Sequence, residues 1–325
     1  MTRPNRPRYA ARLNAFKSRT AGRATVADMI AGAALVGGLD AADLNYPDHF
    51  EDLAPKEVSK HLAEAGLALN GLAMRYYTNP AFKLGAFTHP DAAIRRAAID
   101  QTKRGIDAVR EMGAALMTLW MGQDGFDYAF QMDYAGAWDA TVAAIAEVCD
   151  HDPGVDIAIE YKPNEPRAFA LMPDIGTTLL ACGEVGRGNL GVTLDFAHVL
   201  YADEMPAHSA ALIARHSRLL GLHLNDGYGK RDDGLMAGTV HPVQTVELLV
   251  EMRRQGYDGV IYFDTFPDQG GLDPVLEARA NIAIVERLRA VADDLAGDRA
   301  LADAIARQDA ATSSRIVAAA LYGPL

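Results

Sequence analysis

The sequence predicts an α/β protein built as a (β/α)8 barrel, the TIM barrel architecture, with a C-terminal helical extension. Eight short apolar runs alternate with segments whose apolar residues recur near helical spacing. Several runs follow a glycine, such as Gly66, Gly113 or Gly154, which suits the end of a helix before a strand. Eight such units fit a barrel of about 250 residues with insertions. A doubly wound sheet uses the same alternation and is the competing architecture.

Each strand is expected at one apolar run, and each helix at the segment that follows it. The expected strands lie at residues 10–16, 42–45, 67–74, 115–120, 156–160, 191–195, 219–224 and 259–264. The expected helices lie at residues 25–36, 55–65, 90–112, 137–148, 174–182, 206–216, 242–255 and 274–295. Together they define a catalytic barrel domain over residues 1–297. The Ala-rich segment 298–325 is expected to be a helical tail that packs on this barrel or, as an oligomer arm, on a neighbouring subunit.

The composition limits the class of partner. Of 325 residues, 31 are Lys or Arg and 43 are Asp or Glu, which gives a net charge of −12. This balance argues against nucleic acid or an anionic membrane as a partner and suits a small-molecule substrate. No run of about 18 apolar residues predicts a spanning helix, and the basic segment 1–17 lacks the apolar core of a secretory signal. Cys149 and Cys182 have no metal or redox spacing, so both are expected to be reduced in a cytoplasmic protein.

The last four expected strands end in side chains that bind metals. These are Glu160, Asp195, His223 and Asp264. A single strand-end aspartate is commonly a helix cap, but four apolar strands ending this way are hard to explain as caps. Barrel active sites lie at the C-terminal ends of the strands, so the four side chains are expected at one rim. Clustered carboxylates repel one another unless a cation compensates, which predicts a bound divalent metal.

The ligand chemistry indicates the kind of metal. Carboxylates with imidazole, and without thiolate, favour Mn²⁺, Mg²⁺ or Co²⁺ over a structural zinc ion. His198 follows the sixth strand, and the acidic loop after the seventh carries Asp232 and Asp233. These three residues are candidates for a second metal beside the first. A solvated charged loop is the alternative interpretation of the aspartates.

Lys162 is the candidate catalytic cation. It lies two residues after Glu160, on the same side of an extended chain, whereas Tyr161 points the opposite way. Pro163 and the second proline of "KPNEP" are expected to hold the loop clear of both side chains. Glu165, between these prolines, is expected to face solvent or a loop neighbour.

Three further residues are candidates for the substrate site. Trp120 ends the fourth strand and would form a flat apolar wall, although a core tryptophan is the alternative. Asp226, at the end of the seventh strand, is a candidate for substrate binding. His49, after the second strand, is a candidate catalytic residue, although a lone histidine there is more often a loop residue.

The segments that carry these residues resemble the xylose isomerase family. "IEYKPNEP" is similar to the family's fifth-strand signature, with Tyr161 in place of a proline, and "LWMGQDGFDY" is similar to its fourth-strand segment. "LDFAH" matches the acid-x-x-His of the sixth strand, with Asp195 in place of Glu. "HLNDGYGKRDDGL" with "GTVHP" resembles the bacterial L-rhamnose isomerase branch more closely. The family spaces its loop acids as Asp-x-Asp, so the choice between Asp232 and Asp233 stays open.

The resemblance implies an aldose–ketose isomerase with two divalent metals per subunit, Mn²⁺ foremost, acting on a sugar. Glu160, Asp195, His223 and Asp264 would hold the first metal, with Asp195 bridging to the second. His198 and the acidic loop would complete the second site, and Lys162 would bind the C1 oxygen of the substrate. A homodimer or homotetramer is the implied assembly.

Three alternatives remain open. A sugar or inosose epimerase or dehydratase could use the same metal-binding barrel. An AP-endonuclease-like phosphodiesterase is disfavoured by the acidic composition. A non-catalytic sugar-binding protein is disfavoured by the complete set of charged residues, since unpaired buried charge is costly.

Overall fold

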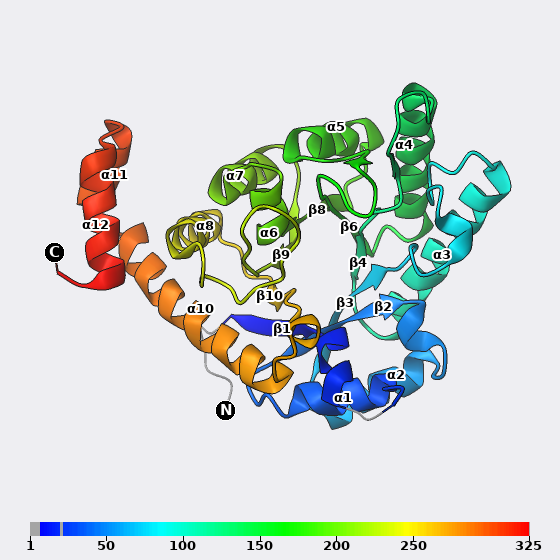
Figure 1. Ribbon diagram of the computed structural model, residues 1–325, viewed down its shortest axis with the longest axis horizontal. Helices are drawn as coiled ribbons and strands as arrows, with labels where there is room; N and C mark the ends of the chain where they lie inside the picture. Colours follow the sequence, from blue (N-terminus) through cyan, green and yellow to red (C-terminus); the bar gives the residue numbers. More distant parts are fainter. Residues whose placement is uncertain (1–6, 20–21, 325) are drawn as a thin grey trace.

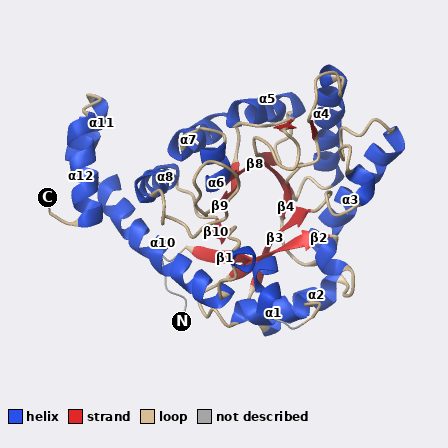
Figure 2. Ribbon diagram, in the orientation of Figure 1, coloured by secondary structure: helices blue, strands red, loops and turns tan. Residues whose placement is uncertain are grey.

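The computed structural model describes residues 7–19 and 22–324, so residues 1–6 of the basic N-terminal segment lie outside it. Its central feature is a closed barrel of eight parallel strands, ringed by helices (Figures 1 and 2). The order around the barrel is β1-β10-β9-β8-β6-β4-β3-β2. In chain order the strands are β1 (Arg8–Arg12), β2 (Ala41–Tyr46), β3 (Ala68–Met74), β4 (Leu116–Leu119), β6 (Asp156–Glu160), β8 (Leu190–Asp195), β9 (Leu219–His223) and β10 (Val260–Phe263). The closed order confirms the (β/α)8 barrel and excludes a doubly wound sheet.

Each predicted helix is present and follows its barrel strand along the chain. The main helices are α1 (Val26–Ala34), α2 (Pro55–Glu64), α3 (Ala92–Glu111), α4 (Tyr134–His151), α5 (Ile175–Val185), α7 (Pro206–His216), α8 (Pro242–Gln255) and α10 (Pro274–Ala296). Short helical turns are η1 (Leu13–Arg19), η2 (Asp48–Phe50), η3 (Pro80–Phe82), α6 (Phe196–Tyr201) and α9 (Pro267–Gly270). None of the helices in the described chain is long and apolar enough to cross a membrane.

The first strand is shorter than the predicted run 10–16. β1 ends at Arg12, and the next residues form the 3₁₀ turn η1. The apolar residues of this turn are buried because it packs on α1, where the side chain of Phe16 lies against Gly32. A buried turn and a buried strand have similar apolar compositions, so the apolar run alone could not show where the strand ends and the turn begins.

A two-stranded antiparallel ribbon follows the C-terminal ends of β4 and β6. It pairs β5 (Gly125–Phe126) with β7 (Phe169–Ala170), and the rings of Phe126 and Phe169 stack at 5.2 Å. This ribbon fastens the loop that contains Lys162 to the loop after Trp120, because the amide of Ala170 also donates to the Pro163 carbonyl.

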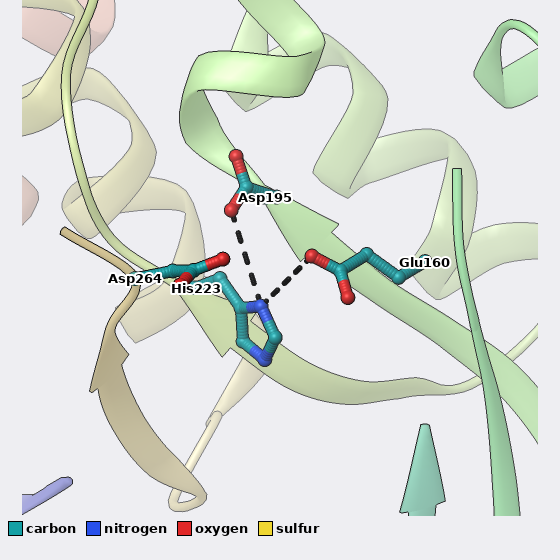
Figure 3. A group of neighbouring side chains, drawn as sticks. All are labelled: Glu160, Asp195, His223 and Asp264. Atoms are coloured by element: carbon teal, nitrogen blue, oxygen red, sulfur yellow. Dashed lines mark hydrogen bonds and ion pairs between the residues drawn. The ribbon is translucent and has the colours of Figure 1, made fainter. Parts of the chain in front are cut away.

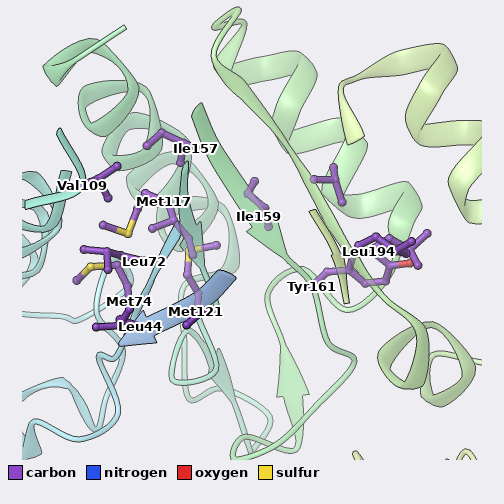
Figure 4. Close-up of a cluster of buried hydrophobic side chains, with 14 of the residues drawn as sticks. Leu44, Leu72, Met74, Val109, Met117, Met121, Ile157, Ile159, Tyr161 and Leu194 are labelled. Atoms are coloured by element: carbon purple, nitrogen blue, oxygen red, sulfur yellow. The ribbon is translucent and has the colours of Figure 1, made fainter. Parts of the chain in front are cut away.

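The barrel strands alternate between an outer apolar layer and an inner layer that is small or polar. The outer layer faces the helices, and Figure 4 shows part of it, formed by Leu44, Leu72, Met74, Val109, Met117, Met121, Ile157, Ile159, Tyr161 and Leu194. Inside the barrel a separate small cluster contains Ala10, Ala41, Val260 and Tyr262. Stability therefore comes mainly from the strand–helix layer, which leaves the inner face free to carry charge.

The end of β6 shows what this alternation does for the site. Tyr161 is 2% exposed in the outer layer, where its hydroxyl donates to Glu204 at 2.8 Å. Glu160 and Lys162, on either side of it, both line the cavity at the mouth of the barrel. The Glu-x-Lys spacing thus places both charged groups on one wall.

The C-terminal tail is helical, as predicted, and projects from one side of the barrel (Figure 1). It consists of α11 (Arg299–Ala306) and α12 (Ala310–Tyr322). Leu301 is buried among apolar residues of α8 and α10, whereas no described residue of α12 is fully buried. Its role as an oligomer arm stays a prediction. Cys149 and Cys182 are both buried and free.

We predict that Leu72→Ala lowers the free energy of unfolding by about 2–5 kcal/mol, because it opens a cavity in the outer layer. Leu72 is 1% exposed. The matched control is Leu180→Ala on α5, where the side chain is 56% exposed and the expected change is within about 0.5 kcal/mol. Urea denaturation followed by circular dichroism measures both variants, and equal losses would contradict the layered packing.

Candidate metal centre and active site

Four strand-end side chains converge at the mouth of the barrel (Figure 3). Glu160, Asp195 and His223 are the last residues of β6, β8 and β9, and Asp264 directly follows β10. One ligand atom from each lies within 4.8 Å of all the others. The His223 Nδ1 atom is 3.1 Å from the nearer Glu160 oxygen and 3.9 Å from an Asp195 oxygen. They meet because these strands are consecutive in the barrel order.

The cluster buries three acidic groups close together, and burial and the neighbouring charges shift the pKa of each. Burial, with further repulsion from Asp232, Glu160 and Asp264, raises the pKa of Asp195 to about 7 although His198 opposes it. Burial and Glu160 likewise raise the pKa of Asp264. Burial acts on Glu160 too, but His223 and His198 outweigh it and lower the pKa of this carboxyl. The site therefore attracts positive charge.

The donor set fits a divalent cation. Three carboxylates and one imidazole, each able to aim one atom at a common point, match the oxygen-rich coordination of Mn²⁺, Mg²⁺ or Co²⁺. Among the described residues this is the one group of three or more such side chains found close enough to hold a metal. The chain can thus hold one cation with residues from four adjacent strands.

Asn225 fixes the orientation of Asp195, and the sequence analysis missed it. Its side-chain amide donates to both Asp195 carboxylate oxygens, at 3.2 and 3.1 Å, while its own oxygen accepts from the Ala197 amide at 2.8 Å. The signal was present, because Asn225 lies two residues after His223 and so belongs to the same inner face. Outer partners of this kind orient metal ligands.

Arg12 supports the cluster from the opposite flank and was also missed. Its Nε atom lies 3.8 Å from Asp264 and donates to the Thr265 carbonyl at 3.1 Å, and its guanidinium pairs with Asp268. The first strand was expected to continue to residue 16, so Arg12 was expected inside the strand and not at the strand end that faces the site. The structure makes it the last residue of β1.

His198, Asp232 and Lys162 form a second charged group beside the cluster. One oxygen of Asp232 lies 3.2 Å from His198 Nε2 and 3.1 Å from the Lys162 ammonium. The other Asp232 oxygen is buried without a hydrogen-bond partner. Burial alone would lower the pKa of His198, but Asp195 and Asp232 dominate and raise it to about 10. The carboxylate of Asp232 thus has one oxygen available to a further cation or donor.

Glu165 meets a neighbour in its own loop, one of the two environments expected for it. The Glu165 carboxylate forms an ion pair with the Lys162 ammonium at 2.9 Å and lines the same cavity. Burial would lower the pKa of Lys162, yet Asp232 and Glu165 outweigh it and raise that pKa, so the group is charged at neutral pH. Lys162 is 8% exposed and therefore presents a fixed ammonium group to the cavity.

Trp120 lies where the sequence placed it, in the wall of this cavity. The Lys162 ammonium sits 5.4 Å from its ring centroid, and the ring of Tyr77 meets it edge-on at 5.2 Å. Its indole nitrogen is buried and has no hydrogen-bond partner. A flat apolar surface thus faces the charged groups across a cavity of about 390 Å³.

Two acidic candidates are placed away from the cavity. Asp233 accepts hydrogen bonds from the Tyr228 amide and the Arg231 side chain, so it stabilises its own loop while Asp232 faces the site. Asp226 is fully buried and accepts from the amides of Gly227, Val240 and His241. Both carboxylates are engaged by loop atoms in this structure, and Asp233 as a metal ligand and Asp226 as a substrate-binding residue stay predictions.

The side chain of His49 is likewise engaged by its neighbours. Its Nδ1 atom accepts from the Asn45 amide at 3.1 Å, and its Nε2 atom lies 2.9 Å from the Asn14 side-chain oxygen. Burial, with Lys17, Arg75 and Arg12 nearby, lowers its pKa to about 3. The imidazole therefore links η1 to β2 through both nitrogens, and its assignment as a catalytic residue stays a prediction.

Comparisons with known proteins agree with this architecture. Residues 31–290 match the sequence profile described as xylose isomerase-like TIM barrel. The xylose isomerase of Thermus thermophilus is 29% identical in an alignment of 226 residues that covers 67% of this chain and 58% of that enzyme, so the match spans less than two thirds of the relative's length.

Solved structures support the fold alone, since their identities are low. A D-psicose 3-epimerase from Clostridium cellulolyticum H10, solved with D-tagatose, superposes with a TM-score of 0.66 at 16% identity, covering 87% of this chain and 99% of that one. An L-ribulose 3-epimerase superposes with a TM-score of 0.68 at 15% identity, covering 90% and 99%.

We predict that Mn²⁺ binding expels a proton and strengthens as the pH rises. Burial would lower the pKa of His223, but Glu160 outweighs it and raises the pKa to about 9, so the imidazole is protonated at pH 7. A metal ligand must be deprotonated, and affinity should rise by about tenfold per pH unit from pH 6 to 9 for each proton released.

Isothermal titration calorimetry in two buffers of different ionisation enthalpy measures this proton release. Asp233→Asn is the matched control, since it removes an acidic group of the neighbouring loop and should leave the Mn²⁺ affinity unchanged. A Mn²⁺ affinity that is flat between pH 6 and 9 would show that His223 is not a ligand.

Proposed function

The chain belongs to the xylose isomerase-like TIM barrel family, and on that premise we propose that it is a divalent-metal-dependent sugar isomerase that interconverts aldoses and ketoses. The observation that carries this proposal is the position of Lys162 beside the four-residue cluster. Glu160 and Lys162 lie on one wall of the cavity, and the ammonium group is held by Glu165 and Asp232. A cation site and a fixed ammonium group can therefore act on neighbouring oxygens of one sugar.

The proposed reaction moves a hydrogen from C2 to C1 and a proton from the C2 oxygen to the C1 oxygen, either as a hydride shift or through an enediol. When bound, a divalent cation polarises the sugar oxygens and offsets negative charge that develops on them. Glu160, Asp195, His223 and Asp264 would hold this cation, and Lys162 would donate hydrogen bonds to the adjacent C1 oxygen. Trp120 packs against the carbon chain and limits water at the reacting carbons.

We place a second cation, as in the sequence-based prediction, between His198 and Asp232. The support for this second site is Asp232. One of its oxygens lies 3.2 Å from His198 Nε2, and the other is buried without a hydrogen-bond partner. Asp195 lies between the two groups, with one oxygen 3.9 Å from His198 Nδ1 and the other 3.9 Å from His223 Nδ1, and it is the carboxylate that the family resemblance implies for both sites. Manganese suits this mixture of oxygen and imidazole donors best, with Mg²⁺ or Co²⁺ as substitutes.

A sugar or inosose epimerase, or a dehydratase, on the same cluster is the second candidate. Two proteins of the same fold are named as 3-epimerases. The products discriminate between the candidates: an aldose from a ketose supports the isomerase, whereas an epimeric ketose or a dehydrated product supports the second candidate.

The test is turnover of a panel of pentoses, hexoses and 6-deoxyhexoses by the Mn²⁺-loaded protein, with products identified by NMR. We expect aldose–ketose interconversion that stops in chelator and returns with Mn²⁺ or Co²⁺. Activity that is unchanged after the metal has been removed and verified absent would refute the proposal.

We predict that Lys162→Met lowers kcat by about 100-fold or more while the Mn²⁺ affinity changes by only a few-fold, because the ammonium group stabilises charge on the substrate and is not itself a ligand. Lys56→Met on the exposed face of α2 is the control and should behave as the unmodified chain. An unchanged kcat would assign Lys162 to loop structure, and lost Mn²⁺ binding would assign it to the integrity of the metal site.

A further inference from the structure

The cavity above the metal cluster contains a cation that no described acidic residue neutralises. Besides His223 and His198, which lie in the acidic cluster and beside it, four lysine or arginine side chains line this cavity: Arg12, Arg75, Lys162 and Arg231. Three of them are ion-paired, Arg12 with Asp268, Lys162 with Glu165 and Asp232, and Arg231 with Asp233. Among the described residues Arg75 forms no ion pair with a carboxylate. Its charge is therefore available within the cavity.

The contacts of Arg75 hold it in place without neutralising it. It directly follows β3, and its backbone amide donates to the Tyr46 carbonyl at 2.9 Å. The guanidinium donates to the Tyr77 hydroxyl and lies 5.1 Å from the centroid of that ring. Its Nε–H is buried and has no hydrogen-bond partner. The acidic Asp48 nearby accepts from Thr78 instead, at 3.0 Å. A buried donor without an acceptor is costly, so this arrangement favours a bound ligand.

The barrel order places Arg75 opposite the metal cluster. β3 and β9 are four strands apart in either direction around the eight-stranded barrel, so Arg75 faces the strand that carries His223. The acidic cluster occupies β6, β8, β9 and β10, the other part of the mouth. A ligand that reaches from the metal ligands across the cavity would therefore arrive at Arg75.

A continuous row of side chains connects Arg75 to Lys162, which lies beside the acidic cluster. The Arg75 guanidinium lies over Tyr77, the ring of Tyr77 meets Trp120 edge-on, and the Lys162 ammonium lies over Trp120. The row offers flat apolar surface between two cations. It suits a carbon chain with polar oxygens at the Lys162 end and a negative charge at the Arg75 end.

We propose that Arg75 binds an anionic group, a carboxylate or a phosphate, at the end of the sugar remote from the reacting carbonyl. The substrate class would then be acidic sugars, and this inference rests on the proposed function of the same site. A guanidinium can meet either anion with two parallel hydrogen bonds, one of them from the unpartnered Nε–H. The cavity of about 390 Å³ accommodates a molecule of monosaccharide size.

Non-reacting linear probes test this inference without turnover. The Mn²⁺-loaded full chain is titrated by calorimetry with D-glucitol, D-glucitol 6-phosphate and D-gluconate at fixed ionic strength. We expect at least one anionic probe to bind about tenfold or more tightly than D-glucitol, and the identity of that probe distinguishes phosphate from carboxylate. Added salt should reduce this difference in the unmodified chain.

Arg75→Ala should abolish the preference for the anionic probe while D-glucitol binding changes by less than about threefold. Arg231→Ala is the matched control, since that guanidinium is 71% exposed in its side chain and already paired with Asp233, so the preference should persist. If Arg75→Ala does not fold, the unmodified chain still tests the inference: its preference for the anionic probe over D-glucitol should fall as salt is added, and a preference that salt leaves unchanged would contradict it.

Two results would overturn the inference: equal binding of all three probes, including no detectable binding of any, or equal weakening of all three by Arg75→Ala. These outcomes are separate from failure of the proposed function. Charge-dependent binding without turnover of neutral sugars, sugar phosphates or sugar acids would refute the isomerase and retain the anion site, whereas turnover of neutral sugars without charge preference would do the opposite.

Discussion

The constraint on which the rest of the site depends is the gathering of three buried carboxylates around one point. Glu160, Asp195 and Asp264 would repel one another strongly in a medium less polar than water. Neighbouring groups partly compensate this negative charge. His223 lies 3.1 Å from Glu160, the Arg12 guanidinium lies 3.8 Å from Asp264, and the Asn225 amide donates to Asp195. These groups compensate the charge only in part, because burial and the other carboxylates still raise the pKa of Asp195 to about 7. The cluster can hold a metal ion that would offset the remaining charge.

The barrel can hold such a cluster because its stability is built elsewhere. The apolar layer between strands and helices contains residues such as Ile157, Ile159 and Tyr161, whereas their neighbours on the same strand face inward. Since side chains alternate along a strand, one strand serves both layers without conflict. Tyr161 is the clearest case, because it is buried against Glu204 while Glu160 and Lys162 face the substrate cavity. A proline at this position would lack that outer hydrogen bond.

The sequence predicts the position of a site residue well when that residue lies in a strand, where side chains alternate, and poorly when it lies in an irregular loop. The barrel and the four cluster residues followed from apolar runs and from the rule that strand ends meet at one rim. Asn225 could have been found by the same period of two. The choice between Asp232 and Asp233 could not, because a loop has no period and the two side chains differ only in which way the chain turns. The partners of His49 could not be predicted either, since Asn14 lies 35 residues away in the turn η1.

The two parts of the barrel mouth differ in chemistry, and that difference has a physical basis. β6, β8, β9 and β10 supply the carboxylates and His223, so they create the strongest negative potential in the cavity. An unpaired cation placed among them would be drawn into ion pairs, as Lys162 is with Asp232. Arg75 forms no such ion pair among the described residues, because β3 lies across the barrel from β9, its guanidinium packs over the Tyr77 ring and the nearby Asp48 carboxylate accepts from Thr78. Separation across the barrel is therefore what allows one small cavity to hold both a cluster that can bind a cation and an arginine without a carboxylate partner.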